Sequence, residues 1–332
     1  KMEFSATAGT AGGSLKALFE VRDGDNLENF KGKVTKADSY SLTVENISID
    51  NIKSLNLPDK DGKITVNNIS YSYDSWEAQV DAQGNIKSVT FNLSKDKAIA
   101  DPEKTVAEGY LLNAGSAINA RGIPYYMTQL NEFVRNFSEM FNQIESKGQN
   151  LNGDTPPTFF EAITNTAKVY DFSESEAYSK LPDGQTATIN SSSNTYYRMT
   201  AANFSVNKDV MNDVSLFATS TDYVKTDSCD IVDELKKLQS EKTVYRGDKA
   251  ESFLETIISN VSVDTEKAET YNKLYSNLEQ TIANQRTSVS GVDEDEEALN
   301  LVKFQYSYNM ASKIISVMNQ MLDKLINDTG VA

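Results

Sequence analysis

The segment LVKFQYSYNMASKIISVMNQMLDKL, residues 301–325, carries the strongest pattern in the sequence. Apolar residues recur in a heptad register, with two apolar positions in each repeat of seven. A repeat of this kind is typical of a coiled-coil helix, whose apolar stripe has to be covered by another helix. We call these positions the a/d seam and predict that they form an assembly interface. The eight residues of the a/d seam are Leu301, Phe304, Tyr308, Ala311, Ile315, Met318, Leu322 and Leu325.

A second long helical region precedes the seam. It is predicted over about 249–289, with a break or bend near 259–264, and a turn at 290–293 (SGVD) leads from it into the final helix. The acidic run 293–297 suits the positive N-terminal end of that helix. Two interpretations stay open for the seam, since it can pack within the chain against 249–289 or against another chain.

Residues 123–147 are predicted to form an amphipathic helix. Apolar residues recur at seven-residue intervals, Pro124 is tolerated in the first turn, and Gly148 is a typical stop. Shorter helices are predicted after Asn207 or Asp209 and after Ser228 or Asp230, because these residues cap helices well.

The region 25–121 has a different character, because β-type runs alternate there with Gly, Asn and Asp turns. One hairpin is predicted between Val80 and Asn85, around Gly84. The β-type runs are 41–49, 63–73, 76–80 and 86–93.

These patterns predict an α+β protein that is mainly a helical bundle, with long coiled-coil-like C-terminal helices and an inserted β-rich domain. The bundle is assigned to 1–24, 122–160 and 203–332, and the inserted domain to 25–121. Residues 161–202 are expected to be irregular, with possible short strands.

The composition of the chain excludes several classes of function. The chain has 332 residues and a net charge of −16, which disfavours nucleic acid as a partner. It has no histidine and one cysteine, so histidine-based catalysis, histidine-ligated zinc and internal disulfides are excluded. No apolar run is long enough to insert into a membrane. We therefore predict a protein with no enzymatic activity, no catalytic residues, no cofactor and no metal.

The segment 286–327 resembles the C-terminus of the flagellar hook-associated protein 1 family, which forms the first part of the hook–filament junction. The segments 12–24 and 130–154 resemble other parts of the same family. The residues that carry the C-terminal resemblance are Arg286, Ser290-Gly291-Val292, Asp295-Glu296-Glu297, Asn300-Leu301, Phe304-Gln305 and Tyr308.

The resemblance implies a structural subunit of the bacterial flagellum that self-assembles into a helical ring of subunits at the junction. It implies hook protein and the second junction protein as partners. An export chaperone is expected to bind the C-terminal helix in the cytosol. The location implied is extracellular, after type III export through the flagellar channel without a cleaved signal peptide.

The sequence departs from the family in two places. The region 25–121 has no confident counterpart, and the family's N-terminal helical half, expected before residue 12, is missing, so we expect a fragment. In the family that helix packs against the C-terminal one, which leaves the order of the final helix open here.

Two alternatives remain. The C-terminal pattern is shared in part with other axial proteins, so a hook or flagellin-like subunit is possible. An extracellular binding module carried by the β-rich insert is the other alternative.

Overall fold

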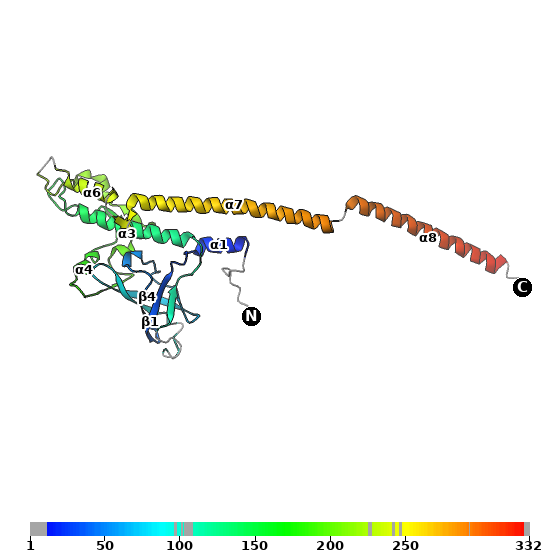
Figure 1. The fold of residues 1–332 in the computed structure, drawn as a ribbon, viewed down its shortest axis with the longest axis horizontal. Coiled ribbons are helices and arrows are strands. Elements are labelled where there is room, and N and C mark those ends of the chain that lie inside the picture. Colours follow the sequence, from blue (N-terminus) through cyan, green and yellow to red (C-terminus); the bar gives the residue numbers. More distant parts are fainter. Residues whose placement is uncertain are drawn as a thin grey trace. The chain divides into compact units, whose positions relative to one another are not determined.

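The computed structural model describes residues 12–95, 98–100, 102, 109–224, 228–240, 243–245, 248–291 and 293–328 (Figure 1). Residues 1–11 of the predicted helical core and Val292 of the predicted turn lie outside the described residues. The chain divides into two compact units, Lys1–Ile257 and Ile258–Ala332. Each unit is described by itself.

A closed six-stranded barrel forms the centre of the first unit. The strands follow the order β3-β6-β1-β2-β5-β4, and pairing of β3 with β4 closes the ring. All of these pairings are antiparallel. The strands are β1 (Phe30–Asp38), β2 (Ser41–Glu45), β3 (Gly62–Val66), β4 (Ile69–Val80), β5 (Ile86–Leu93) and β6 (Leu111–Ala114).

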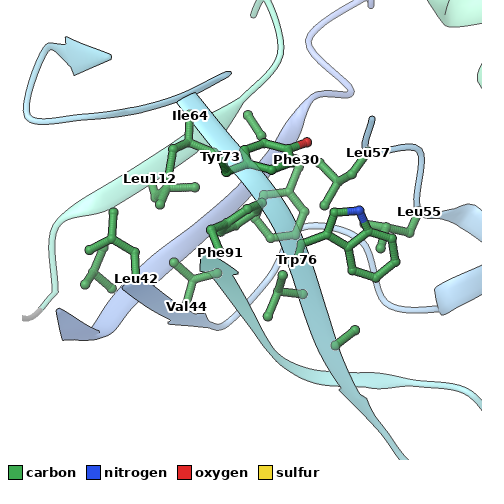
Figure 2. Packing of buried hydrophobic residues seen from close by; sticks show 14 of the residues in the cluster. Phe30, Leu42, Val44, Leu55, Leu57, Ile64, Tyr73, Trp76, Phe91 and Leu112 are labelled. Carbon is green, nitrogen blue, oxygen red and sulfur yellow. The ribbon is translucent and has the colours of Figure 1, made fainter. Parts of the chain in front are cut away.

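The barrel is filled by side chains that alternate along the strands. In β4, Tyr73, Trp76 and Ala78 are fully buried, whereas Glu77 points to solvent. Figure 2 shows Tyr73, Trp76 and Phe91 together in this interior, and the rings of Tyr73 and Phe91 lie 5.1 Å apart. Burial of these aromatic surfaces is the main stabilising term of the barrel.

Two tight turns set the strand register. The predicted hairpin at Val80–Asn85 is confirmed: Gly84 has φ 78°, and the Asp81 carboxylate accepts hydrogen bonds from the backbone N–H groups of Gln83 and Asn85. The predicted single run 63–73 is instead a hairpin. Asn67 and Asn68, both at positive φ, turn the chain between β3 and β4, as a two-residue hairpin turn requires.

Further short strands and helices complete the chain. Strand β8 (Ala187–Asn190) adds to the barrel by pairing with β4, and β7 (Phe160–Ala162) pairs with β9 (Phe204–Val206). The remaining elements are α1 (Ser14–Asp23), η1 (Ile52–Ser54), α3 (Ile123–Glu145), α4 (Ser175–Ser179), η2 (Tyr196–Arg198), α5 (Lys208–Asn212), η3 (Val214–Leu216), α6 (Asp230–Ser240), β10 (Thr243–Tyr245), β11 (Asp248–Lys249), α7 (Ala250–Ser290) and α8 (Glu294–Asp328).

Helix α3 confirms the helix predicted over 123–147 and connects the parts of the first unit. Its Ile144 packs with Ile231 and Leu238 of α6. Its Phe133 stacks on Phe253 at the start of α7, with ring centroids 5.6 Å apart. The opposite face of α3 is polar and also buried, because it contacts η1 and η2 beside the barrel.

The predicted fold class, a mainly helical bundle with a β-rich insert, is wrong in its main element. The closed barrel organises the first unit, and helix makes up about 47% of the chain. Two strands that the sequence analysis missed, β1 and β6, complete the ring. The long helices also bury few residues: α7 buries Ala250, Phe253 and Ile257, and the described part of α8 buries none.

The chain enters and leaves the barrel at one point. Gly24 follows α1 and Gly122 precedes α3, and the Gly122 N–H donates to the Gly24 carbonyl over 3.0 Å. A Cβ on Gly122 would lie 2.4 Å from the carbonyl oxygen of Glu20, so a larger residue does not fit. Asp25 and Arg121 form the adjoining β-bridge.

Arg135 of α3 holds three segments together. Its side chain is 2% exposed and donates to the carbonyl oxygens of Met199, Lys53 and Leu55 over 2.7–3.0 Å. The guanidinium also lies 4.5 Å from the ring centroid of Tyr197. Tyr197 in turn donates its hydroxyl to the Leu57 carbonyl.

We expect Arg135→Met to lower the free energy of unfolding by about 3–5 kcal/mol, because it leaves two buried carbonyl groups and one part-buried carbonyl group without their donor. Denaturant unfolding measures the loss. Arg198→Met is the matched control, since Arg198 also lies over a tyrosine ring but is partly exposed, and a loss below about 1 kcal/mol is expected there. Equal losses in both variants would contradict the role of Arg135.

Glu145, at the C-terminal end of α3, is a buried carboxyl group. Its Oε1 accepts a 2.6 Å hydrogen bond from the Ala218 N–H, and Oε2 has no hydrogen-bond partner among the described residues. Burial raises its pKa from 4.5 to about 7, and the Ala218 bond opposes this only in part. The protonated form is therefore favoured in the folded chain, and stability is lost as pH rises from about 4.5 through about 7.

Glu145→Gln should remove this pH dependence and raise the free energy of unfolding above pH 7 by up to about 3 kcal/mol. The Gln carbonyl still accepts the Ala218 bond without a charge. Denaturant titrations at pH 5 and pH 8 measure the change, with the exposed Glu45→Gln as control. An unchanged slope against pH in Glu145→Gln would refute the assignment.

Candidate assembly surface

Helix α8 begins at a capped and acidic N-terminus. The Asp293 carboxylate accepts a 3.0 Å hydrogen bond from the Asp295 N–H, and the Asp293 carbonyl accepts from the Glu297 N–H. Four acidic residues occupy the first turn, where the helix dipole favours negative charge. These interactions fix the first residue of the helix that carries the a/d seam.

The structure brings all eight residues of the a/d seam onto α8, and all are exposed. Among the larger side chains of the seam, Leu322 is the least exposed at 51% and Phe304 the most at 74%. A regular helix turns by about 100° per residue, so a heptad register places these residues along one side. The role of the seam in assembly stays a prediction.

Helix α8 also carries a second exposed apolar stripe, which the sequence analysis missed. Its successive members are three or four residues apart, so that Leu299, Met310 and Met321 follow one another at intervals of eleven residues. We call this set the second stripe. Its members are Leu299, Val302, Tyr306, Met310, Ile314, Val317 and Met321, all at least half exposed.

The two stripes occupy different faces of α8. At about 100° per residue their mean directions differ by roughly 130° around the helix axis. Polar residues such as Ser316, Gln320 and Asp323 occupy the remaining face. A two-stranded coiled coil covers only a narrow a/d stripe. The apolar surface of α8 is therefore wide enough for more than one neighbour.

Helix α7 is continuous over Ala250–Ser290, so the predicted break near 259–264 is wrong. Within the second unit it too presents apolar side chains in a heptad register. Val261, Tyr275, Ile282 and Val289 recur at multiples of seven and are between 43% and 88% exposed. This second unit thus consists of helices whose apolar faces are open.

The described residues give no sign of other chemistry on this surface. They contain no cluster of three or more His, Cys, Asp or Glu side chains able to hold a metal ion. Across those same residues, no helix combines the length and the apolar character that a membrane span needs.

Comparisons with known proteins find sequence similarity in the segment that contains α8. Residues 283–328, from the end of α7 through α8, match the family model described as flagellar basal body rod FlgEFG protein C-terminal. The chain is also 24% identical over 215 residues to flagellar hook-associated protein 1 of Bacillus subtilis (strain 168). That match covers 63% of this chain and 36% of the relative, so the chain spans little more than a third of that protein's length.

The class of protein that these findings support is an axial protein of the bacterial flagellum, with α8 in the shared C-terminal segment. Within that class, the resemblance to flagellar hook-associated protein 1 that the sequence indicated is confirmed, and the findings support a flagellar hook-associated protein.

The exposure of α8 has a measurable consequence for the chain alone. A helix without buried side chains is stabilised mainly by its own hydrogen bonds, which makes it marginal. We expect the amides of Leu301–Leu325 to exchange with deuterium at least roughly a hundredfold faster than those of β4 and β5. Hydrogen-exchange mass spectrometry measures both segments in one sample. Equal protection would contradict an open seam.

Proposed function

We propose that this protein is a non-enzymatic structural subunit of the flagellar hook–filament junction, which assembles through α8. The observation that carries the proposal is the wide apolar surface of α8, located inside the segment that matches the flagellar rod C-terminal family. Exposed apolar side chains at this density are unfavourable in water unless another subunit or segment covers them.

The two stripes favour packing on two sides. In a tube of identical subunits, each subunit makes heterologous contacts, so one helix meets different neighbours on different faces. The a/d seam would pack against one helical neighbour and the second stripe against another. Gln320 and the polar face would then remain in contact with water.

The identity of the subunit within the axial class rests on the extent of similarity. The C-terminal match alone is equally suited to a hook or rod subunit, since its description names a rod protein. The match to hook-associated protein 1 extends over 215 residues and favours the junction. Hook protein and the second junction protein are accordingly the proposed neighbours, and the location is the extracellular flagellum.

Export imposes a further requirement on α8. We propose that a cytosolic chaperone covers the a/d seam before the chain passes through the type III export channel, without cleavage of a signal peptide. An open apolar surface of this width would otherwise promote premature association in the cytosol.

Substitutions on three faces of α8 test the assembly. We expect Ile315→Asp in the seam and Val317→Asp in the second stripe both to abolish assembly, because each places a charge in an apolar contact. Gln320→Asp, on the polar face, is the matched control and should assemble normally. Immunogold electron microscopy of flagella from the source bacterium, together with swimming assays, measures the outcome.

Each result has a distinct meaning. Gold confined to the hook–filament boundary supports the junction, and gold along the filament or hook would reassign the protein to another axial subunit. Normal assembly of Ile315→Asp would refute the role of the seam. Normal assembly of Val317→Asp with failure of Ile315→Asp would indicate a single helical neighbour instead of two.

A further inference from the structure

A cavity of about 530 Å³ lies beside the C-terminal half of α3 in the first unit. Its walls come from three places: that half of α3, the segment 157–161, which includes the start of β7, and the segment 169–175. The volume lies in the range of small-molecule sites. Residues that represent these walls are Glu139, Asn142, Gln143, Thr158, Glu161 and Asp171.

Glu161, in the middle of β7, is a buried carboxylate on the wall of this cavity. The residue is 5% exposed, and its carboxylate forms no hydrogen bond or ion pair with any of the described residues. Its oxygen atoms are not sealed off by the surrounding protein. A buried carboxylate normally has a cation or hydrogen-bond donors beside it, because the loss of hydration otherwise disfavours its charge. The unpaired carboxylate of Glu161 therefore indicates a cationic group that the cavity receives.

The surroundings of Glu161 favour a positive charge. Among the described residues that line the cavity there is no lysine or arginine. Burial raises the pKa of Glu161 and the nearby Asp209 raises it further, whereas Lys208 opposes them without forming an ion pair. A cation bound at Glu161 would offset both unfavourable effects on its carboxylate.

The other two carboxylates of the wall already have partners and do not define the site. The Nζ atom of Lys53 lies 2.5 Å from Oε2 of Glu139, which neutralises that charge. Asp171 accepts hydrogen bonds from the N–H and hydroxyl groups of Ser173 over 3.0 and 2.8 Å. Because both of these donors are neutral, Asp171 keeps its negative charge and adds to the attraction for a cation.

The backbone that carries Glu161 is fixed along both edges of β7. The Phe160 N–H donates to Oδ1 of Asn142, and Nδ2 of Asn142 donates to the Phe160 carbonyl, both over 2.9 Å. The Tyr170 N–H donates to the Ala162 carbonyl over 2.9 Å. On the other edge, β7 pairs with β9. Glu161 is thus held in position before any ligand arrives, which lowers the entropy cost of binding.

Apolar groups form part of the cavity wall beside these polar ones. The rings of Phe172 and Tyr196 stack with their centroids 4.4 Å apart, and Pro157 and Val169 also line the cavity. Walls of this kind suit the aliphatic stem that carries an ammonium or guanidinium group.

We propose that this cavity binds an organic cation, whose ammonium or guanidinium group donates hydrogen bonds to the Glu161 carboxylate. The same chemistry can come from a free alkylamine or from an arginine side chain of another polypeptide. The proposal does not depend on the function of α8, since every wall residue lies between Glu139 and Asn207.

Titration of the whole chain with two cations and their neutral counterparts tests the proposal. The cations are butylammonium and N-acetyl-arginine methylamide, and the counterparts are 1-butanol and N-acetyl-citrulline methylamide. The readout is the NMR signals of the Glu161 and Asp171 backbone amides. We expect saturable shifts with at least one cation and none with its counterpart. Tighter binding of the arginine derivative would identify a peptide side chain as the source, and tighter binding of butylammonium a free amine.

Two variants separate recognition from folding. Glu161→Gln keeps the shape and loses the charge, so it should weaken cation binding by at least about tenfold. It should also raise the melting temperature of the free protein, because an unpaired buried charge is removed. Asp171→Asn keeps the oxygen that accepts the Ser173 N–H and should weaken binding by a smaller factor, since Asp171 is exposed. Asp183→Asn, at an exposed position outside the cavity, is the matched control and should bind like the unchanged protein.

The proposal fails if neither cation shifts the Glu161 and Asp171 amides, or if the neutral counterparts bind as tightly as the cations. It also fails if Glu161→Gln binds the cations as tightly as the unchanged protein does. A lower melting temperature of Glu161→Gln together with retained binding would show that the carboxylate serves the fold alone.

Discussion

The guanidinium group of Arg135 joins parts of the first unit that lie far apart in the sequence. Lys53 and Leu55 belong to the segment around η1, whose Leu55 packs in the barrel core, and Met199 follows η2. A buried cation is tolerable only when its donors are satisfied, so the three carbonyl groups and Arg135 depend on one another. Because Tyr197 lies under the guanidinium and against Trp76, the same contact extends into the barrel core. Helix, loop and barrel therefore form one cooperative structure.

Elements with a local sequence pattern could be predicted from the sequence. Elements whose burial depends on contacts with distant residues could not. The heptads of α8, the 123–147 helix and the Gly84 hairpin follow from spacing alone. Strand β1 was missed because lysines dominate FKGKVTKAD, although Phe30 and Val34 point inward. The polar face of α3 is buried by hydrogen bonds to loops, which no periodicity reveals. The second stripe of α8 was hidden because its eleven-residue interval interleaves with the heptads.

The two units are stabilised in different ways. In the first, the barrel core and smaller apolar clusters are enclosed by the chain itself. In the second, the helices are regular but leave their apolar faces open, so their final order depends on what covers them.

The barrel is attached to the rest of the first unit at several separate points. Gly24 and Gly122 alone would act as a pivot, because both connections pass through one place. Strand β8, which the chain contributes long after leaving the barrel, adds a second attachment along β4, and Arg135 adds a third. Three attachments at separate points restrict how far the barrel can turn against α3. A force applied to the barrel surface would therefore be transmitted to α3, and the barrel would turn little on its own.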